Sequence, residues 1–179
     1  MDSTLAITYL GALVLLLAGV SWLVIRQILK ARSLENVISE LQPKLQKEKG
    51  TPEDYYQLGS VYLRKKLYAQ AIALFNKAIK EGGENLPEVY NALGFAYFSQ
   101  DQYDLAIKNY KEAISLQAGY VTAINNLGYA YEKKKLLPQA IEMYEQVLVL
   151  DEKNETAKRR LTSLRKQFVP TASQKTRWY

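Results

Sequence analysis

The chain of 179 residues contains no cysteine and no histidine. Their absence removes the thiolate nucleophile, the commonest general base and the usual ligands of zinc and copper sites. Disulfides are excluded as well, so nothing points to an oxidising compartment. Glycine-rich phosphate loops and the G-x-S-x-G motif of serine hydrolases are also missing. We therefore interpret the chain as a non-enzyme with no cofactor, no metal and no small-molecule substrate.

Neither sign of charge is in excess over most of the chain. Residues 1–51 carry six basic and four acidic side chains, and residues 52–154 carry eleven and thirteen. Residues 155–179 hold seven basic side chains against Glu155 alone, so the net charge of +6 resides there. This basic run is short and lacks a known nucleic-acid-binding motif, which argues against a nucleic-acid partner.

One long run has no charge at all, from Leu5 to Ile25. As a helix these 21 residues would span about 31 Å, close to the thickness of a bilayer's hydrocarbon core. Basic residues follow the run rather than precede it, which opposes a cleaved signal peptide. We predict a single-pass membrane anchor with its basic flank over 1–32, oriented with the rest of the chain on the cytoplasmic side or in an equivalent compartment.

Residues 33–51 are predicted to form an amphipathic stalk. Its apolar residues recur with helical spacing: Leu34, Val37, Ile38, Leu41 and Leu45. Pro43 disfavours helix at Gln42, so we expect the helix to kink or end there and a polar spacer to follow. A plain stalk and a membrane-lying or self-associating helix both remain open.

The remaining chain is repetitive. The motif Leu-Gly-x-x-Tyr occurs at 58–62, 93–97 and 127–131, and a small residue and then an aromatic follow each copy at fixed spacing. A period of about 34 residues with this core is identified as the tetratricopeptide repeat, or TPR. We predict an all-α fold, namely a single transmembrane helix followed by a solenoid of three repeats over 52–86, 87–120 and 121–154 and a capping helix over 155–168.

Each repeat should contain two helices. The predicted helices span 52–65, 68–81, 87–100, 103–116, 121–134 and 137–150. Thr51 is expected to cap the first of them, with Pro52 at its first position and Asp54 completing a capping box. The motif glycines and the alanines that follow them let paired helices approach closely.

TPR proteins hold other proteins on the concave face that the first helix of each repeat lines. Carrying that over predicts a partner-binding groove with an aromatic floor and a ladder formed by two amides, Asn91 and Asn125. The groove residues are Tyr56, Ser60, Leu63, Arg64, Asn91, Phe95, Phe98, Asn125, Tyr129 and Glu132. The alternative is that the asparagines only hydrate the inner face.

Chaperone-binding TPR proteins grip a C-terminal carboxylate with Lys, Asn and Arg at set groove positions. The corresponding residues here are Tyr56, Ser60, Ala92, Thr122 and Asn126. That clamp is absent, so we do not expect a receptor for chaperone tails.

The C-terminal segment is predicted to be a basic capping helix followed by a basic flexible tail over 169–179. Its expected contact residues are Lys158, Arg159, Arg160, Arg165 and Lys166. They could dock on anionic lipid or on an acidic partner surface. A solvated capping helix explains them equally well.

An uncharged N-terminal span, a short stalk and three repeats in about 180 residues resemble one family in particular. Together with the wording of residues 41–80 (LQPKLQKEKGTPEDYYQLGSVYLRKKLYAQAIALFNKAIK), this layout is similar to the membrane-anchored TPR proteins of cyanobacteria and plastids that assist photosystem I assembly. The resemblance implies a thylakoid (or plasma) membrane location and photosystem I subunits or assembly intermediates as partners. A general TPR adaptor for protein translocation or for cytochrome or envelope complex biogenesis is the alternative.

Overall fold

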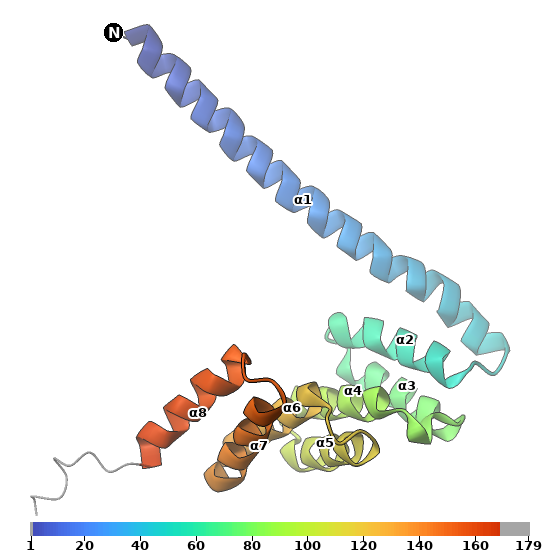
Figure 1. Ribbon diagram of the computed structural model, residues 1–179. Helices are drawn as coiled ribbons and strands as arrows, with labels where there is room; N and C mark the ends of the chain where they lie inside the picture. The colour runs from blue at the N-terminus through green and yellow to red at the C-terminus, as the bar shows by residue number, and fades with distance from the viewer. Residues whose placement is uncertain (1, 169–179) are drawn as a thin grey trace, which may run out of the picture. The chain divides into compact units, whose positions relative to one another are not determined.

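The computed structural model describes residues 2–168, and the predicted tail over 169–179 lies outside the described residues. The described chain is helical apart from its turns and short connections, as the sequence predicts. It divides into two compact units, one ending at Glu48 and one beginning at Lys49. The helices are α1 (Asp2–Lys47), α2 (Pro52–Arg64), α3 (Tyr68–Lys80), the 3-10 turn η1 (Gly83–Asn85), α4 (Pro87–Phe98), α5 (Tyr103–Leu116), α6 (Val121–Lys133), α7 (Leu137–Leu150) and α8 (Glu155–Phe168) (Figure 1).

The first unit is one long helix. By length and composition α1 could cross a membrane, and large apolar side chains from Ile7 to Leu29 are exposed along it. The sequence left two alternatives at Pro43, a kink or an end of the helix. An end near Gln42 is wrong, because Pro43 lies inside the helix and α1 continues to Lys47. Proline removes only one backbone donor, and residues beyond it still bond normally, since the Glu48 amide donates to the Lys44 carbonyl over 2.9 Å.

The second unit begins with the predicted capping box. The Thr51 hydroxyl accepts from the Asp54 amide over 3.2 Å, and the Asp54 carboxylate accepts from the Thr51 amide over 3.0 Å. Pro52 occupies the first turn of α2. The six repeat helices agree with the predicted ranges to within two residues, and each packs on the next along the chain.

Close contact within each repeat occurs at the motif glycine. A methyl group at Gly94 would lie 2.7 Å from two ring carbons of Tyr110, and one at Gly59 would lie 2.7 Å from the Phe75 ring. These aromatic side chains are at most 1% exposed, and Tyr144 fills the equivalent place in the third repeat. The motif glycine and the aromatic residue that follows the motif therefore form one contact, with the ring lying over the glycine.

The turns between the paired helices also repeat. Lys66, Asp101 and Lys135 adopt left-handed backbone conformations with φ near +60°. The residue after each donates its amide back to the carbonyl of the motif tyrosine, for example from Leu67 to Tyr62 over 2.9 Å. This bond ends the first helix in the manner of a Schellman motif, so the motif tyrosine also marks the end of its helix.

The last helix closes the core, as predicted. Asn154 caps α8 by accepting from the Ala157 amide over 3.1 Å. Ala157, Leu161 and Leu164 are buried in a cluster with Val147 of α7. Phe168, the last residue of α8, has a side chain outside the described set. Helix α8 thus covers the apolar end of the third repeat.

Candidate partner-binding groove

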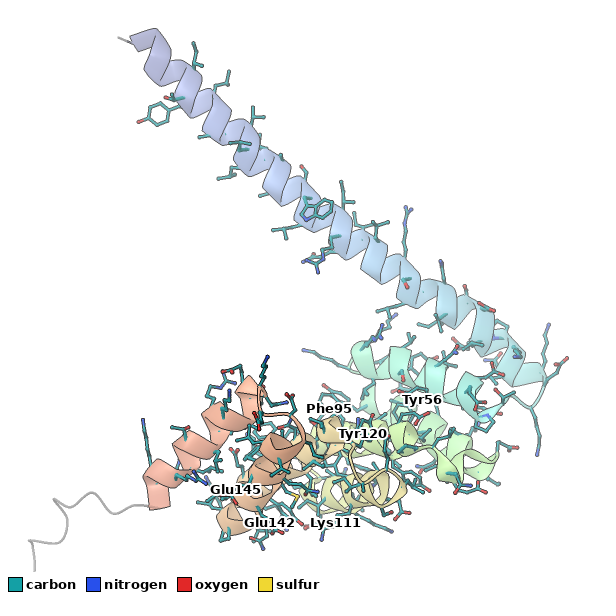
Figure 2. All side chains as sticks on the ribbon, viewed as in Figure 1. Tyr56, Phe95, Lys111, Tyr120, Glu142 and Glu145 are labelled. Carbon is teal, nitrogen blue, oxygen red and sulfur yellow. The ribbon has the colours of Figure 1, made fainter. Side chains whose placement is uncertain are left out.

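The predicted groove residues lie on α2, α4 and α6, the first helices of the three repeats. Phe95 is 44% exposed, and Arg64 at the end of α2 is exposed. The others are half-buried: Tyr56, Ser60, Leu63, Asn91, Phe98, Asn125, Tyr129 and Glu132. Figure 2 shows Tyr56, Phe95 and Tyr120 gathered on one side of the repeat unit, while Lys111, Glu142 and Glu145 lie toward its other side.

Two side-chain amides of this face bond to each other, and one of them is Asn91 of the predicted ladder. Asn126 Nδ2 donates to Asn91 Oδ1 over 3.0 Å, and Asn91 Nδ2 donates to the Tyr120 hydroxyl over 3.4 Å. Asn125, predicted as the second member of the ladder, has a buried Oδ1 without a hydrogen-bond partner within the described residues. Asn91 and Asn125 hold the same motif position, so on parallel helices they point the same way and cannot face each other.

Tyr120 was missed because it precedes α6 and lies outside the helical face used for prediction. Burial raises the pKa of its hydroxyl, and the neighbouring Tyr56 and Glu88 raise it further, while the hydrogen bond from Asn91 opposes them. The hydrogen bond places the Tyr120 hydroxyl beside Asn91 of α4. The sequence feature that could have indicated Tyr120 is an aromatic residue directly before the first helix of the third repeat.

Aromatic rings extend the surface toward the third repeat. The Phe98 ring lies 4.9 Å from the Tyr129 ring, centroid to centroid, and 5.3 Å from Tyr103. Both distances suit tilted aromatic contact. The predicted aromatic surface therefore continues from α4 to α6.

Two predicted residues from different sites are bonded to each other. Arg160 of α8 forms an ion pair with Glu132 of α6, with Nη1 to Oε2 at 3.0 Å, and its guanidinium carbon lies 3.9 Å from the centre of the Tyr129 ring. The side chains of Arg160 and Glu132 are 26% and 19% exposed. The capping helix therefore occupies the third-repeat end of the predicted groove.

The other basic residues of α8 face outward. Arg165 pairs with Glu145 over 2.6 Å and Lys158 with Glu155 over 3.3 Å. Arg159 and Lys166 are exposed and form no ion pair within residues 2–168. The five residues predicted to act together thus divide into one that closes the groove and four on the surface.

The fold and this face define a class of protein, the TPR solenoid that binds protein segments. Family models agree, with matches described as TPR repeat at residues 96–135 and as tetratricopeptide repeat at 55–81 and 123–158. Among solved structures, a MamA RS-1 double mutant aligns with a TM-score of 0.71 at 23% identity, covering 80% of each chain. The first TPR domain of RPAP3, bound to an HSP90 peptide, aligns at 0.64 with 22% identity, covering 68% of this chain and 95% of that one.

Relatives found by sequence define the family more narrowly than the TPR fold does. The Ycf37 protein of Cyanophora paradoxa is 40% identical over 151 residues, which cover 83% of this chain and 87% of that one. The chloroplast protein PYG7 of Arabidopsis thaliana is 39% identical over 167 residues, 92% of this chain but 56% of PYG7. The chain belongs to the Ycf37/PYG7 family of TPR proteins. This confirms the family resemblance, although the chain spans little more than half of PYG7.

Proposed function

We propose that the chain is a non-catalytic, membrane-anchored scaffold that assists the assembly or stability of photosystem I by binding its subunits or assembly intermediates. We base the proposal on two features that occur in one chain of this family. The apolar side chains of α1 from Ile7 to Leu29 are exposed, and the TPR unit carries an exposed Phe95 on the same side as Tyr56 and Tyr120. A soluble protein has no reason to leave the apolar side chains of α1 in water.

The anchor and its orientation follow from α1. Arg26 and Arg32 come directly after the apolar run, and basic flanks remain on the cytoplasmic side during insertion. The repeats would then face the cytoplasm or stroma from a thylakoid or plasma membrane. Protease added to sealed vesicles of known sidedness should digest the repeats only from that side. Digestion from the lumenal side alone would reverse the orientation.

The groove is the proposed contact for the partner. Phe95 offers an exposed ring, and the amides around it can bond to the backbone of an extended segment. No basic side chain stands at the five clamp positions, which removes the chemistry for holding a chaperone's terminal carboxylate.

Co-purification from native membranes tests both parts. The tagged full chain, extracted in mild detergent, should carry photosystem I subunits, and the double variant Tyr56→Ala/Phe95→Ala should lose most of them. Leu105→Ala is the matched control, because Leu105 on α5 is 42% exposed and lies outside the groove. Translocation or cytochrome-assembly components in place of photosystem I subunits would overturn the assignment. Equal recovery with the groove variant would overturn the role of the groove.

A further inference from the structure

The third-repeat end of the predicted groove is occupied by contacts within the chain. Arg160 covers Tyr129 and neutralises Glu132, and Phe98 packs against the same tyrosine ring. Over the first two repeats Phe95 is exposed, and Tyr56, Glu88, Asn91 and Tyr120 are half-buried. We call these five residues the open region. A bound segment must therefore be recognised by α2, α4 and the entry of α6, without help from the third repeat's ion pair.

The charge of this open region is acidic. Glu88 lies three residues before Asn91 and seven before Phe95, which places it on the same face of α4. Glu53 holds the corresponding place on α2, three residues before Tyr56. Within the described residues neither carboxylate forms an ion pair. Each therefore has its charge available to a partner.

The basic residues of the first helices are at their other ends. Arg64 is the last residue of α2, eleven positions after Glu53, and Lys133 is the last residue of α6. At 1.5 Å per residue, Glu53 and Arg64 are separated by about 16 Å along the axis, beyond the screening length at physiological salt. The acidic part of the groove is consequently not neutralised from within.

We propose that this open region binds a partner segment bearing a lysine or arginine next to an apolar side chain, the reverse of the acidic tails that a carboxylate clamp holds. The cation lies beside Glu88 and the tyrosine rings, which attract it through charge and through the ring faces. The apolar neighbour packs on Phe95, and Asn91 and Asn126 stand beside the segment's backbone. The inference rests on the proposed function, since it names the chemistry of the same groove.

The charges of the open region distinguish a cationic segment from an anionic one. The surroundings of Tyr120 support it, because Asn91 donates to the Tyr120 hydroxyl over 3.4 Å and Glu88 lies about one helical turn before Asn91 on α4. An anionic segment in the same place would meet Glu53 and Glu88 with no basic side chain from the open region to compensate.

Peptide binding to the full chain in non-ionic detergent tests the charge preference. The probes are three fluorescein-labelled ten-residue peptides that differ at two positions, which hold lysine, glutamine or glutamate between leucines. By fluorescence anisotropy at low salt the lysine peptide should bind about tenfold more tightly than the glutamate peptide, as expected for two exposed ion pairs. The variant Glu53→Gln/Glu88→Gln should remove that difference, and 0.5 M salt should reduce it.

Two further variants distinguish a failure of the charge preference from a failure of the groove as the binding site. Glu112→Gln/Glu142→Gln changes two exposed carboxylates on the second helices and should leave the preference intact. Phe95→Ala should weaken all three peptides alike. A lysine peptide that binds no better than the glutamate peptide, or a preference that survives Glu53→Gln/Glu88→Gln, overturns the inference. If Phe95→Ala changes nothing while the preference remains, the groove itself is not the binding site and the proposed function fails separately.

Discussion

At the scale of single residues, the motif glycines set the distance between paired helices. Glycine costs about 1 kcal/mol against alanine inside a helix, so each position must return that cost through packing. The aromatic ring of the second helix provides this packing, because it occupies the space that a methyl group on the glycine would need. The contact is closest at Gly94 and Gly59. It is slightly looser at Gly128, where an added methyl carbon would lie 3.0 Å from the nearest ring carbon of Tyr144.

Gly94→Ala should therefore destabilise the repeat unit. The added methyl meets the Tyr110 ring and, at 3.2 Å, the Ala106 carbonyl oxygen, which is backbone and cannot rotate away. Overpacking of this kind costs about 1–3 kcal/mol, and the helix-propensity gain offsets up to about 1 kcal/mol of it. Urea unfolding of the detergent-purified chain measures the loss. Gly119→Ala, with no atom within 4 Å, is the control, and equal effects of the two changes would contradict the packing argument.

The buried tyrosines predict alkaline sensitivity. Burial raises the pKa of Tyr110 well above its usual value of 10, so above pH 10 the folded chain keeps a proton that the unfolded chain releases. Stability is therefore complete below pH 10 and falls above it, by about 1.4 kcal/mol per pH unit for one such group. Tyr110→Phe should reduce that slope between pH 10 and 12 in urea unfolding. An unchanged slope would show that Tyr110 does not titrate on unfolding.

At the scale of helices, α8 both caps the core and narrows the groove. Its apolar face packs on α7, and Arg160 reaches the first helix of the third repeat. In the proposed function, this one helix limits the part of the concave face that a partner can contact. The two functions are carried by different faces of the same fourteen residues.

Replacing Arg160 should loosen α8 more than replacing a surface arginine. Arg160→Ala removes a half-buried ion pair and a guanidinium–ring contact, which together are worth about 1–2 kcal/mol. Arg165→Ala is the control, because its pair with Glu145 is largely exposed and contributes at most about 0.5 kcal/mol. Urea unfolding and hydrogen exchange of the α8 amides measure the difference. Equal protection of α8 in both variants would contradict the role given to Arg160.

At the scale of the whole molecule, the chain consists of two units with opposite surface chemistry. The large apolar side chains of α1 from Ile7 to Leu29 are exposed, whereas those of the repeats form a core. That core begins after the N-cap Thr51 and is closed at one end by α8. Each unit therefore requires a different solvent. This is the physical reason for expecting the first in a bilayer and the second in water.

Deleting residues 1–48 should convert the protein from a membrane-bound to a soluble form. The remaining chain keeps Thr51 and the capping box, so it should retain its helical circular dichroism and unfold cooperatively. The full chain should stay with the membrane fraction after alkaline washing, while the shortened chain should be recovered in the supernatant. Release of the full chain by the wash would contradict an integral anchor.

Much of this architecture could be predicted from the sequence because it is local and periodic. The motif spacing predicted six helices to within two residues, Thr51 and Pro52 predicted a helix start, and the uncharged run predicted the character of α1. Among the helix boundaries, the predicted end of α1 near Gln42 was wrong. Pro43 removes one backbone donor, and a helix whose other hydrogen bonds persist does not end there.

Which side chains meet on the predicted groove face depended on tertiary structure. Periodicity identifies the face on which Asn91 lies, but the neighbour of that face depends on how adjacent helices pack, and the packing placed Asn126 beside Asn91. It also placed Tyr120 beside Asn91 and Arg160 beside Glu132, a pair separated by 28 residues. The sequence by itself therefore determined the helices, their faces and the distribution of charge. Which side chains meet across repeats was decided by packing, because contacts between separate helices leave no period along the chain.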